Sequence, residues 1–253
     1  MSLQEVGKNI PKKIPRPEAI LAISAHYERE DTSVTSNEKL KTIHDFYGFP
    51  QELYDQKYDC PGSKELITKV KDLVKEVNFS TKWGVDHGVW SVLSKMYPDA
   101  EIYVVEMSIN RKRSTQLHYE MGKKLYKLRE EGILIFCAGN IVNNIMMMQM
   151  SGSLYKWAIS FDDKVKKFVT DRNDMKLVDY ELIGEEALLS VNTTEHYIPL
   201  IYPLSVTNKN ENASFFGEKI IYASISMRCI LFEDPTQVIF KNTITQGISV
   251  NGE

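Results

Sequence analysis

The chain has little cysteine and no cysteine pair. Its three cysteines, Cys60, Cys137 and Cys229, lie far apart and form no CxxC spacing. An odd number of scattered cysteines supports neither a disulfide framework nor a zinc–thiolate site. A chain of 253 residues can also bury most of its apolar surface without such staples, so any bound metal would serve chemistry rather than folding. The reducing cytoplasm is the compartment that this cysteine usage favours.

The chain also lacks an excess of basic charge and any long apolar run. Its 31 Lys and Arg residues face 34 Asp and Glu residues, for a net charge of −3. Because this balance cannot neutralise a phosphate backbone, we do not expect nucleic acid as a partner. No stretch approaches the ~18 apolar residues of a membrane span, and the N-terminus shows no signal-peptide core. We therefore expect no membrane partner and a cytoplasmic location.

Signatures of several common enzyme classes are missing as well. The motifs HExxH, GxSxG, GxGxxG and GxxxxGKS/T do not occur, so metalloprotease, serine hydrolase, dinucleotide-binding and P-loop activities have no support. No internal repeat or low-complexity segment divides the chain. We therefore treat residues 1–253 as a single domain.

What the chain does contain is an alternation of strand and helix patterns. Ala19–Ser24 is a continuous apolar run, typical of a strand that is buried on both faces. Apolar residues recur at helical spacing over 63–77 and 114–131, and further apolar strands are predicted at 102–105 and 132–138. Strands that alternate with helices predict an α/β fold, with a central, mostly parallel or mixed sheet flanked by helices.

The C-terminal half carries three other patterns. Strict alternation over Lys219–Phe232 predicts one further strand, with Tyr222 on its polar face. The run Ile145–Met150, which contains four methionines, is expected in the core, because apolar runs are usually buried. The alternative for this run is an adaptable partner-binding surface. Residues 233–253 form a tail for which the sequence predicts no function.

Ligands of open α/β sheets bind beyond the carboxyl ends of the strands. The first predicted strand ends at His26, and the strand predicted at 132–138 runs into the segment Asn140–Asn144. If these two strands are parallel neighbours, both exits lie at one edge of the sheet. The sequence therefore favours a binding crevice at this edge.

The chain has only five histidines, and four of them lie at element ends or in loops. His118 is the exception, and we expect it on a partly exposed helix surface. His44 lies in an aromatic loop, where a backbone-bonded ring is favoured over a functional one. His87 follows Asp86, which would cap the next helix, and His196 precedes another predicted helix. Imidazoles from distant loops can bind Zn²⁺ or Fe²⁺, so this spacing neither supports nor excludes a metal site.

Six longer phrases occur in one order along the chain. They are Ala22–His26, Thr42–Pro50, Asp86–Trp90, Met96–Pro98, Gly139–Val142 and Glu195–Leu200. Together they resemble the class III extradiol ring-cleavage dioxygenases, in the LigB-like branch that contains the DOPA dioxygenases. The resemblance spans roughly residues 10–232, and long phrases in a fixed order are far more specific than any single histidine.

The resemblance implies a single α/β domain that binds a non-haem Fe(II), or Zn²⁺ as purified. Such an enzyme opens the ring of a small catechol-type aromatic with O₂, and these two molecules are the expected partners. By resemblance, His44 and His196 match metal ligands. His87 matches a catalytic or substrate-binding histidine, and His26 lies on the same rim. The sequence leaves a homo-oligomer open.

Three further residues are candidates for the substrate pocket, namely Asp45, Asn143 and Tyr222. Asp45, or alternatively Glu195, could complete a metal site of two histidines and one carboxylate. Proximity in the sequence to His44 and His196 is the reason for these two choices.

Two features depart from the family pattern. The family begins with a strand that ends in His-Gly-Ser-Pro, whose histidine binds the metal, and this chain begins downstream of that phrase. The family also continues from Gly-Asn-Val-Val into a histidine, where this chain has Asn143. An amide takes up no proton near neutral pH and is a poor transition-metal ligand. The alternative prediction is therefore a catalytically impaired homologue that keeps the pocket and holds little or no metal.

Overall fold

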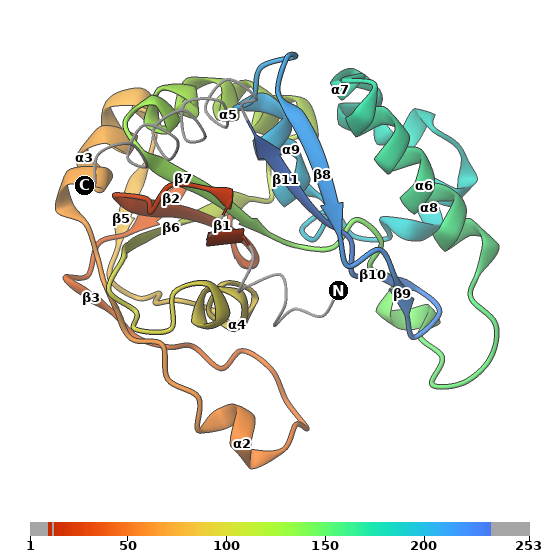
Figure 1. Cartoon of the computed structure of the whole chain (residues 1–253), viewed down its shortest axis with the longest axis horizontal. Helices are drawn as coiled ribbons and strands as arrows, with labels where there is room; N and C mark the ends of the chain where they lie inside the picture. Colours follow the sequence, from red (N-terminus) through yellow and green to blue (C-terminus); the bar gives the residue numbers. More distant parts are fainter. Residues whose placement is uncertain (1–9, 12, 234–253) are drawn as a thin grey trace, which may run out of the picture.

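Five strands form the central sheet of the protein, in the order β5-β2-β6-β1-β7 (Figure 1). In that order they span Asn78–Ser80, Ser33–Thr35, Tyr103–Asn110, Ala19–Arg29 and Ile133–Ala138. The computed structural model describes residues 10–233 except residue 12. β1 pairs in parallel with β6 and β7, β2 pairs in parallel with β5, and β2 runs antiparallel to β6. This mixed, mostly parallel sheet confirms the predicted fold class.

Helices cover both faces of this sheet (Figure 1). The helices that flank it span Lys64–Leu73 (α3), His87–Met96 (α4), Thr115–Glu130 (α5) and Ile198–Ser205 (α9). Side chains of α3, α5 and α9 share one core with the sheet, and side chains of α4 share another. The sheet therefore lies between two apolar layers.

β1 is buried because it lies in the middle of this arrangement. Alternate residues of a strand point to opposite faces. Leu21 and Ile23 accordingly join the core with α3, α5 and α9, whereas Ile20 and Ala22 join the core with α4. All four side chains are fully buried. A strand covered on both faces needs a continuous apolar run, which is why Ala19–Ser24 could be recognised in the sequence.

A second group of helices packs around a core of its own beside α9. These helices span Lys156–Thr170 (α6), Asp174–Val178 (α7) and Glu185–Ser190 (α8). Phe161, Val165 and Tyr197 are fully or almost fully buried among them. The remaining short elements are β3 (Lys39–Leu40), α2 (Gln51–Tyr54), β4 (Cys60–Pro61) and the 3₁₀ turns Ile145–Met147 and Tyr180–Leu182. None of the helices in the described part of the chain combines the length and the apolar character needed to cross a membrane.

The C-terminal region forms short strands in place of the single strand that the alternation predicts. They span Asn212–Phe216 (β8), Ile220–Ile221 (β9), Ile225–Ser226 (β10) and Cys229–Glu233 (β11). β8 pairs with β11 and β9 pairs with β10, both antiparallel. Tyr222 and Ala223 have φ angles of 48° and 63°, so the chain reverses there. Two left-handed residues cannot lie within a strand, and the alternation of residue types did not reveal them. Residues 234–253, most of the predicted tail, lie outside the described residues.

The methionine-rich run Ile145–Met150 is exposed, so the expectation that it is buried is wrong. Met146 and Met150 have exposed fractions of 87% and 84%. The run lies in the connection from β7 to α6, where only a short 3₁₀ turn forms. The run does not form part of a long helix or strand, so it has no regular face that could pack against the core.

His118 is fully buried in α5, in contrast with the partly exposed position expected from the sequence. Its Nδ1 lies 2.8 Å from the Tyr202 hydroxyl, and its Nε2 lies 3.1 Å from the Asn110 carbonyl oxygen. The hydroxyl can donate to Nδ1 while Nε2–H donates to the carbonyl, an arrangement that requires the neutral ring. Burial lowers the pKa of His118 to about 4.

We expect His118 to make the stability of the protein depend on pH. The pKa of histidine is 6.5 in the unfolded chain and about 4 in the folded protein. Between these values the unfolded chain binds a proton that the folded chain does not, so the free energy of unfolding falls as the pH drops from 6.5 towards 4. The whole shift corresponds to about 3 kcal/mol. Denaturation of the wild type and of His118→Gln at about pH 7 and about pH 4.5 measures the contribution of His118 to the free energy of unfolding. The variant should lose that part of the dependence, and an unchanged profile would contradict the assignment.

Candidate active site

His26 lies in β1 where the pairing of this strand with both of its neighbours is interrupted. β1 pairs with β7 only as far as Ser24, opposite Ala138, and its pairing with β6 is interrupted between Ile23 and Glu28. Irregularities of this kind redirect side chains next to functional sites. The backbone N–H of His26 donates to the Ser24 hydroxyl at 3.2 Å. His26 therefore faces the crevice that the sequence predicts, but the strand does not end there as predicted, because β1 continues to Arg29 and pairs with β6 again from Glu28.

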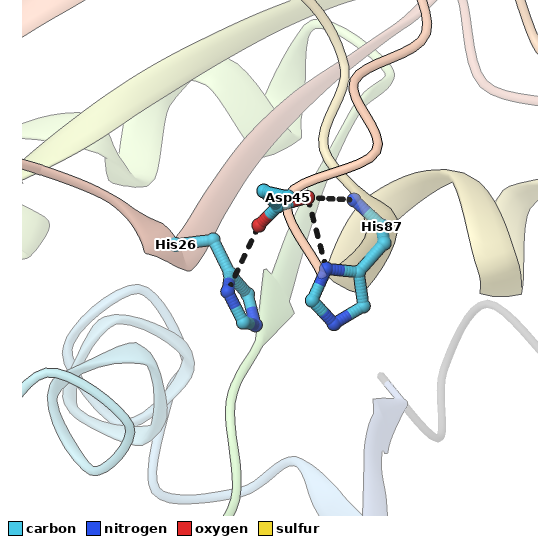
Figure 2. A group of neighbouring side chains, drawn as sticks. All are labelled: His26, Asp45 and His87. Atoms are coloured by element: carbon cyan, nitrogen blue, oxygen red, sulfur yellow. Dashed lines mark hydrogen bonds and ion pairs between the residues drawn. The ribbon is translucent and has the colours of Figure 1, made fainter. Parts of the chain in front are cut away.

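Asp45 lies between His26 and a second histidine, His87 (Figure 2). One oxygen of Asp45, Oδ1, accepts hydrogen bonds from the backbone N–H of His87 at 3.1 Å and from its Nδ1 at 2.9 Å. The other oxygen, Oδ2, lies 3.0 Å from Nδ1 of His26. The two histidine rings are 4.1 Å apart between centroids. A single carboxylate thus orients both imidazoles, which are brought together from β1 and from the start of α4.

The start of α4 is fixed to β1 by Asp86, the residue that caps this helix. Its Oδ1 accepts from the backbone N–H groups of Gly88 and Val89 and from the hydroxyl of Ser24. The predicted cap is confirmed. Because the same oxygen binds the helix and the strand, the positions of His87 and His26 are coupled.

A buried glutamate, Glu106 of β6, holds the capping residue Asp86 in place. Glu106 accepts from the backbone N–H of Asp86 at 3.1 Å and from the indole N–H of Trp83 at 3.0 Å. Burial raises the pKa of both Asp86 and Glu106. Sequence reasoning missed Glu106, although one signal was present: it is the only charged residue within the apolar strand that starts at Ile102.

The electrostatics of the site favour a charged pair between Asp45 and His26. Burial disfavours the protonated ring of His26, but the hydrogen bond to Asp45 and the charges of Asp86 and Glu195 outweigh it, so the pKa of His26 is raised above 6.5. Burial likewise disfavours the Asp45 carboxylate, and the hydrogen bonds from His26 and His87 outweigh it, so the pKa of Asp45 lies well below its ordinary range. Asp45 is therefore an anion throughout the physiological range.

His196 lies beside this group, on the turn before α9. Its ring centroid is 5.4 Å from that of His26, and its Nδ1 is 3.1 Å from a carboxylate oxygen of Glu195. That contact lowers the pKa of Glu195 to about 2. The carbonyl oxygen of His196 accepts from the backbone N–H of Asn140 at 3.1 Å, which joins this turn to the end of β7.

A cavity of about 920 Å³ opens in front of these side chains. His26, His87 and His196 all line it, and much of the remaining wall is apolar, including Phe136 and Pro199. Apolar walls with a few convergent polar groups are typical of sites for small ligands. Three of the histidines that the sequence singled out, His26, His87 and His196, therefore line the same cavity.

His44 does not join this group. Its Nε2 lies 2.9 Å from the carbonyl oxygen of Gln56, and its ring packs against Phe46 and Trp90. This geometry departs from the prediction that His44 and His196 hold one metal together. The reason is local: neighbouring residues in extended backbone point to opposite sides, and here Asp45 takes the side that faces His26 and His87.

Two of the predicted pocket residues also lie elsewhere. Asp45, Asn143 and Tyr222 are all absent from the described residues that line the cavity, although Asp45 contacts two residues that do line it, His26 and His87. The backbone of Asn143 bonds to Ser190 and forms a bridge with Ile225, which fixes it behind the wall. Tyr222 lies in the turn after β9, where its φ of 48° reverses the chain, and the residues of this segment that line the cavity begin only at Ile225. Asp45 is the pocket candidate that the structure places at the centre of the group.

The donor atoms of the group could bind a metal ion. His26, Asp45 and His87 each offer one nitrogen or oxygen atom, and these atoms lie within 4.8 Å of one another. Two imidazoles and one carboxylate form the ligand set of many non-haem Fe(II) sites, and such sites keep positions open for substrate and O₂. These residues therefore fit a divalent transition metal, with Asp45 as the carboxylate that the sequence suggested.

Comparison with known proteins identifies the family. Residues 1–217 match the family described as "Catalytic LigB subunit of aromatic ring-opening dioxygenase", and the chain belongs to this family of extradiol dioxygenases. It is 42% identical over 234 residues to the 4,5-DOPA dioxygenase extradiol of Escherichia coli (strain K12), which covers 89% of this chain and 84% of that protein. The resemblance drawn from the six phrases is thus confirmed.

A plant relative and a solved structure agree with this assignment. The 4,5-DOPA dioxygenase extradiol of Beta vulgaris is 35% identical over 204 residues, covering 78% of this chain and 76% of that protein. The crystal structure of an uncharacterized protein from Escherichia coli K12 superposes with a TM-score of 0.78 at 35% identity, over 90% of this chain and 91% of that one.

Proposed function

We propose that the protein is an Fe(II)-dependent extradiol dioxygenase that opens the ring of a catechol-type aromatic with O₂. The observation that carries the proposal is the group His26–Asp45–His87, whose two histidines line a large cavity, in a chain of this family. Two relatives are named for DOPA, which is itself a catechol. The fit of substrate class, ligand set and cavity is what supports the proposal.

His26, Asp45 and His87 would hold the metal. Bound iron would supply a redox-active centre at which a catecholate and O₂ can be held together. Zn²⁺ suits the same donors, but it is redox-inert and could not support this reaction. The raised pKa of His26 means that metal must compete with a proton at this ring, so metal binding is expected to weaken as the pH falls.

We assign His196 the role of accepting a proton from a catechol hydroxyl. Its ring lines the cavity, and its partner is Glu195 rather than Asp45, so it lies outside the group that would hold the metal. A carboxylate beside a histidine fixes the orientation of the ring, as a general base requires. The apolar wall, which includes Phe136 and Pro199, would hold the aromatic ring and limit the access of water.

The proposal is tested by anaerobic reconstitution with Fe(II), followed by measurement of O₂ uptake and of ring-opened product with a panel of catechols that includes DOPA. Activity should require iron and a substrate with two adjacent hydroxyls. Protein loaded with Zn²⁺ is the matched control and should be inactive. Iron bound in a one-to-one ratio without O₂ uptake on any catechol would favour the alternative of an impaired homologue, and so would a failure to bind iron at all.

A further inference from the structure

Two carboxyl groups, those of Asp86 and Glu106, lie fully buried at the start of α4. Asp86 caps this helix, which begins with His87, and Glu106 belongs to β6. Oε1 of Glu106 accepts from the backbone N–H of Asp86 at 3.1 Å, and the two carboxyl groups are themselves in hydrogen-bond contact. A carboxylate has no donor, so a hydrogen bond between two carboxyl groups requires a proton on one of them.

The two carboxylate oxygens of Asp86 differ in their partners. Oδ1 accepts from the backbone N–H groups of Gly88 and Val89 and from the Ser24 hydroxyl, at 2.9–3.3 Å. Oδ2 is buried as well, and no N–H or hydroxyl group of the described residues donates to it. Buried acceptors without a donor are rare in folded proteins. A proton on Glu106 would supply the missing donor.

The surroundings favour a proton on Glu106 over one on Asp86. The three donors to Oδ1, the N-terminus of α4 and the charge of the nearby His26 all favour the ionised form of Asp86. Glu106 accepts from only two N–H groups, and the ionisable groups that interact with it, Asp86, Tyr27 and Cys60, are all acidic. Burial and the charge of Asp86 raise the pKa of Glu106 well above its ordinary value. The neutral form of Glu106 is therefore the favoured one.

We propose that Glu106 is a positioning residue of the active site, which as a neutral acid donates a hydrogen bond to Oδ2 of Asp86. This bond fixes the rotation of the Asp86 carboxylate, so that Oδ1 is held between α4 and the Ser24 hydroxyl of β1. His87 begins α4 and His26 lies two residues after Ser24, so the positions of both rings depend on that carboxylate. Their role as metal ligands is that of the proposed function, whereas the proton on Glu106 does not depend on it. An ionised Glu106 would instead repel Asp86 and leave Oδ2 without a donor.

Infrared spectroscopy of the full chain tests whether Glu106 carries the proton. At about pH 7 ordinary carboxyl groups are ionised, since their pKa values lie at about 4. The wild type should nevertheless show the C=O stretching band of a protonated carboxyl group, and Glu106→Gln should lack this band. Glu101→Gln, which alters an exposed glutamate, is the matched control and should keep it. A wild type without the band, or a band that persists in Glu106→Gln, would overturn the proposal.

The same proton should appear in the pH dependence of stability. Above the ordinary glutamate pKa of 4.5 the unfolded chain loses the Glu106 proton while the folded protein keeps it, so the wild type becomes less stable as the pH rises. Glutamine has no proton to lose. The folding equilibrium constant of Glu106→Gln, divided by that of the wild type, should therefore rise about tenfold for each pH unit between about pH 5 and about pH 7. Chemical denaturation across this range measures the ratio, and a constant ratio would contradict a neutral Glu106.

Metal affinity tests the positioning role of Glu106. Co²⁺, which suits the same nitrogen and oxygen donors and absorbs visible light, serves as the probe. Glu106→Gln should bind Co²⁺ within about threefold of the wild type, because its amide N–H can donate to Oδ2 of Asp86, whereas Glu106→Leu should bind at least about tenfold more weakly. Trp83→Phe is the control, since it removes only the indole donor to the other oxygen of Glu106 and should leave the affinity unchanged.

Two outcomes of the Co²⁺ titration would show that Glu106 does not position the metal ligands. One is an unchanged affinity in Glu106→Leu, and the other is an equal loss in both Glu106 variants. A wild type that binds no Co²⁺ would contradict the proposed function, and the infrared band would still decide whether Glu106 carries the proton.

Discussion

Replacement of Asp45 by asparagine is expected to lower iron affinity about a hundredfold and ring-opening activity about a thousandfold. Asp45 is the one carboxylate that contacts both His26 and His87, at 2.9–3.1 Å. Asparagine keeps the shape but loses the charge, and its amide group can accept from only one of the two rings. Iron content per chain and O₂ uptake under saturating catechol measure the two effects.

His44→Gln is the matched control, because it alters the neighbouring residue in the same loop. The geometry predicts that this variant retains iron, since His44 is bonded to the Gln56 carbonyl. The family resemblance predicts the opposite, since it assigns His44 to the metal. If His44→Gln loses iron while Asp45→Asn keeps it, the site described above is wrong and the assignment by resemblance is right.

The sequence predicted those helices and strands in which the spacing of apolar residues follows directly from which faces are buried. The residues Ala19–Ile23 are all apolar because both faces of β1 are covered, and the helix at 114–131 shows its buried stripe. The C-terminal region was predicted incorrectly, because its alternating residues span several short strands and a left-handed turn at Tyr222 and Ala223. Alternation reports which residue types repeat, and it does not report where the backbone reverses.

The sequence predicted which histidines lie near the candidate site, but it did not predict which side chains contact them. His26 and His87 were found from their positions at a strand end and a helix start, and the structure brings them together. Which of His44 and Asp45 faces them depends on the rotation of one extended loop, fixed by the contact of Ile43 with Val85, and no local pattern reports it. Glu106 differs in this respect, because its position as a single charge in an apolar strand was visible in the sequence, whereas its contacts with Asp86 and Trp83 were not.

Gly139→Ala is expected to lower the free energy of unfolding by about 4 kcal/mol. Gly139 lies just after β7, where the chain passes the turn that carries His196. A Cβ atom at this position would lie 2.2 Å from the carbonyl oxygen of His196 and 2.9 Å from the Pro199 ring. The backbone oxygen cannot move aside as a flexible side chain would, so the two segments must separate. Chemical denaturation of wild type and variant measures the cost.

The same separation should move His196 away from the cavity, because the hydrogen bond from Asn140 to the His196 carbonyl oxygen lies beside the new methyl group. We therefore expect ring-opening activity to fall at least about tenfold even where the variant is folded, with iron content unchanged, since His26, Asp45 and His87 lie on other segments. Gly48→Ala is the control: Gly48 has a φ of 76° but open space around it, so it should cost only about 1 kcal/mol of backbone strain. Equal costs for the two variants would show that β7 and the His196 turn do not approach as closely as described.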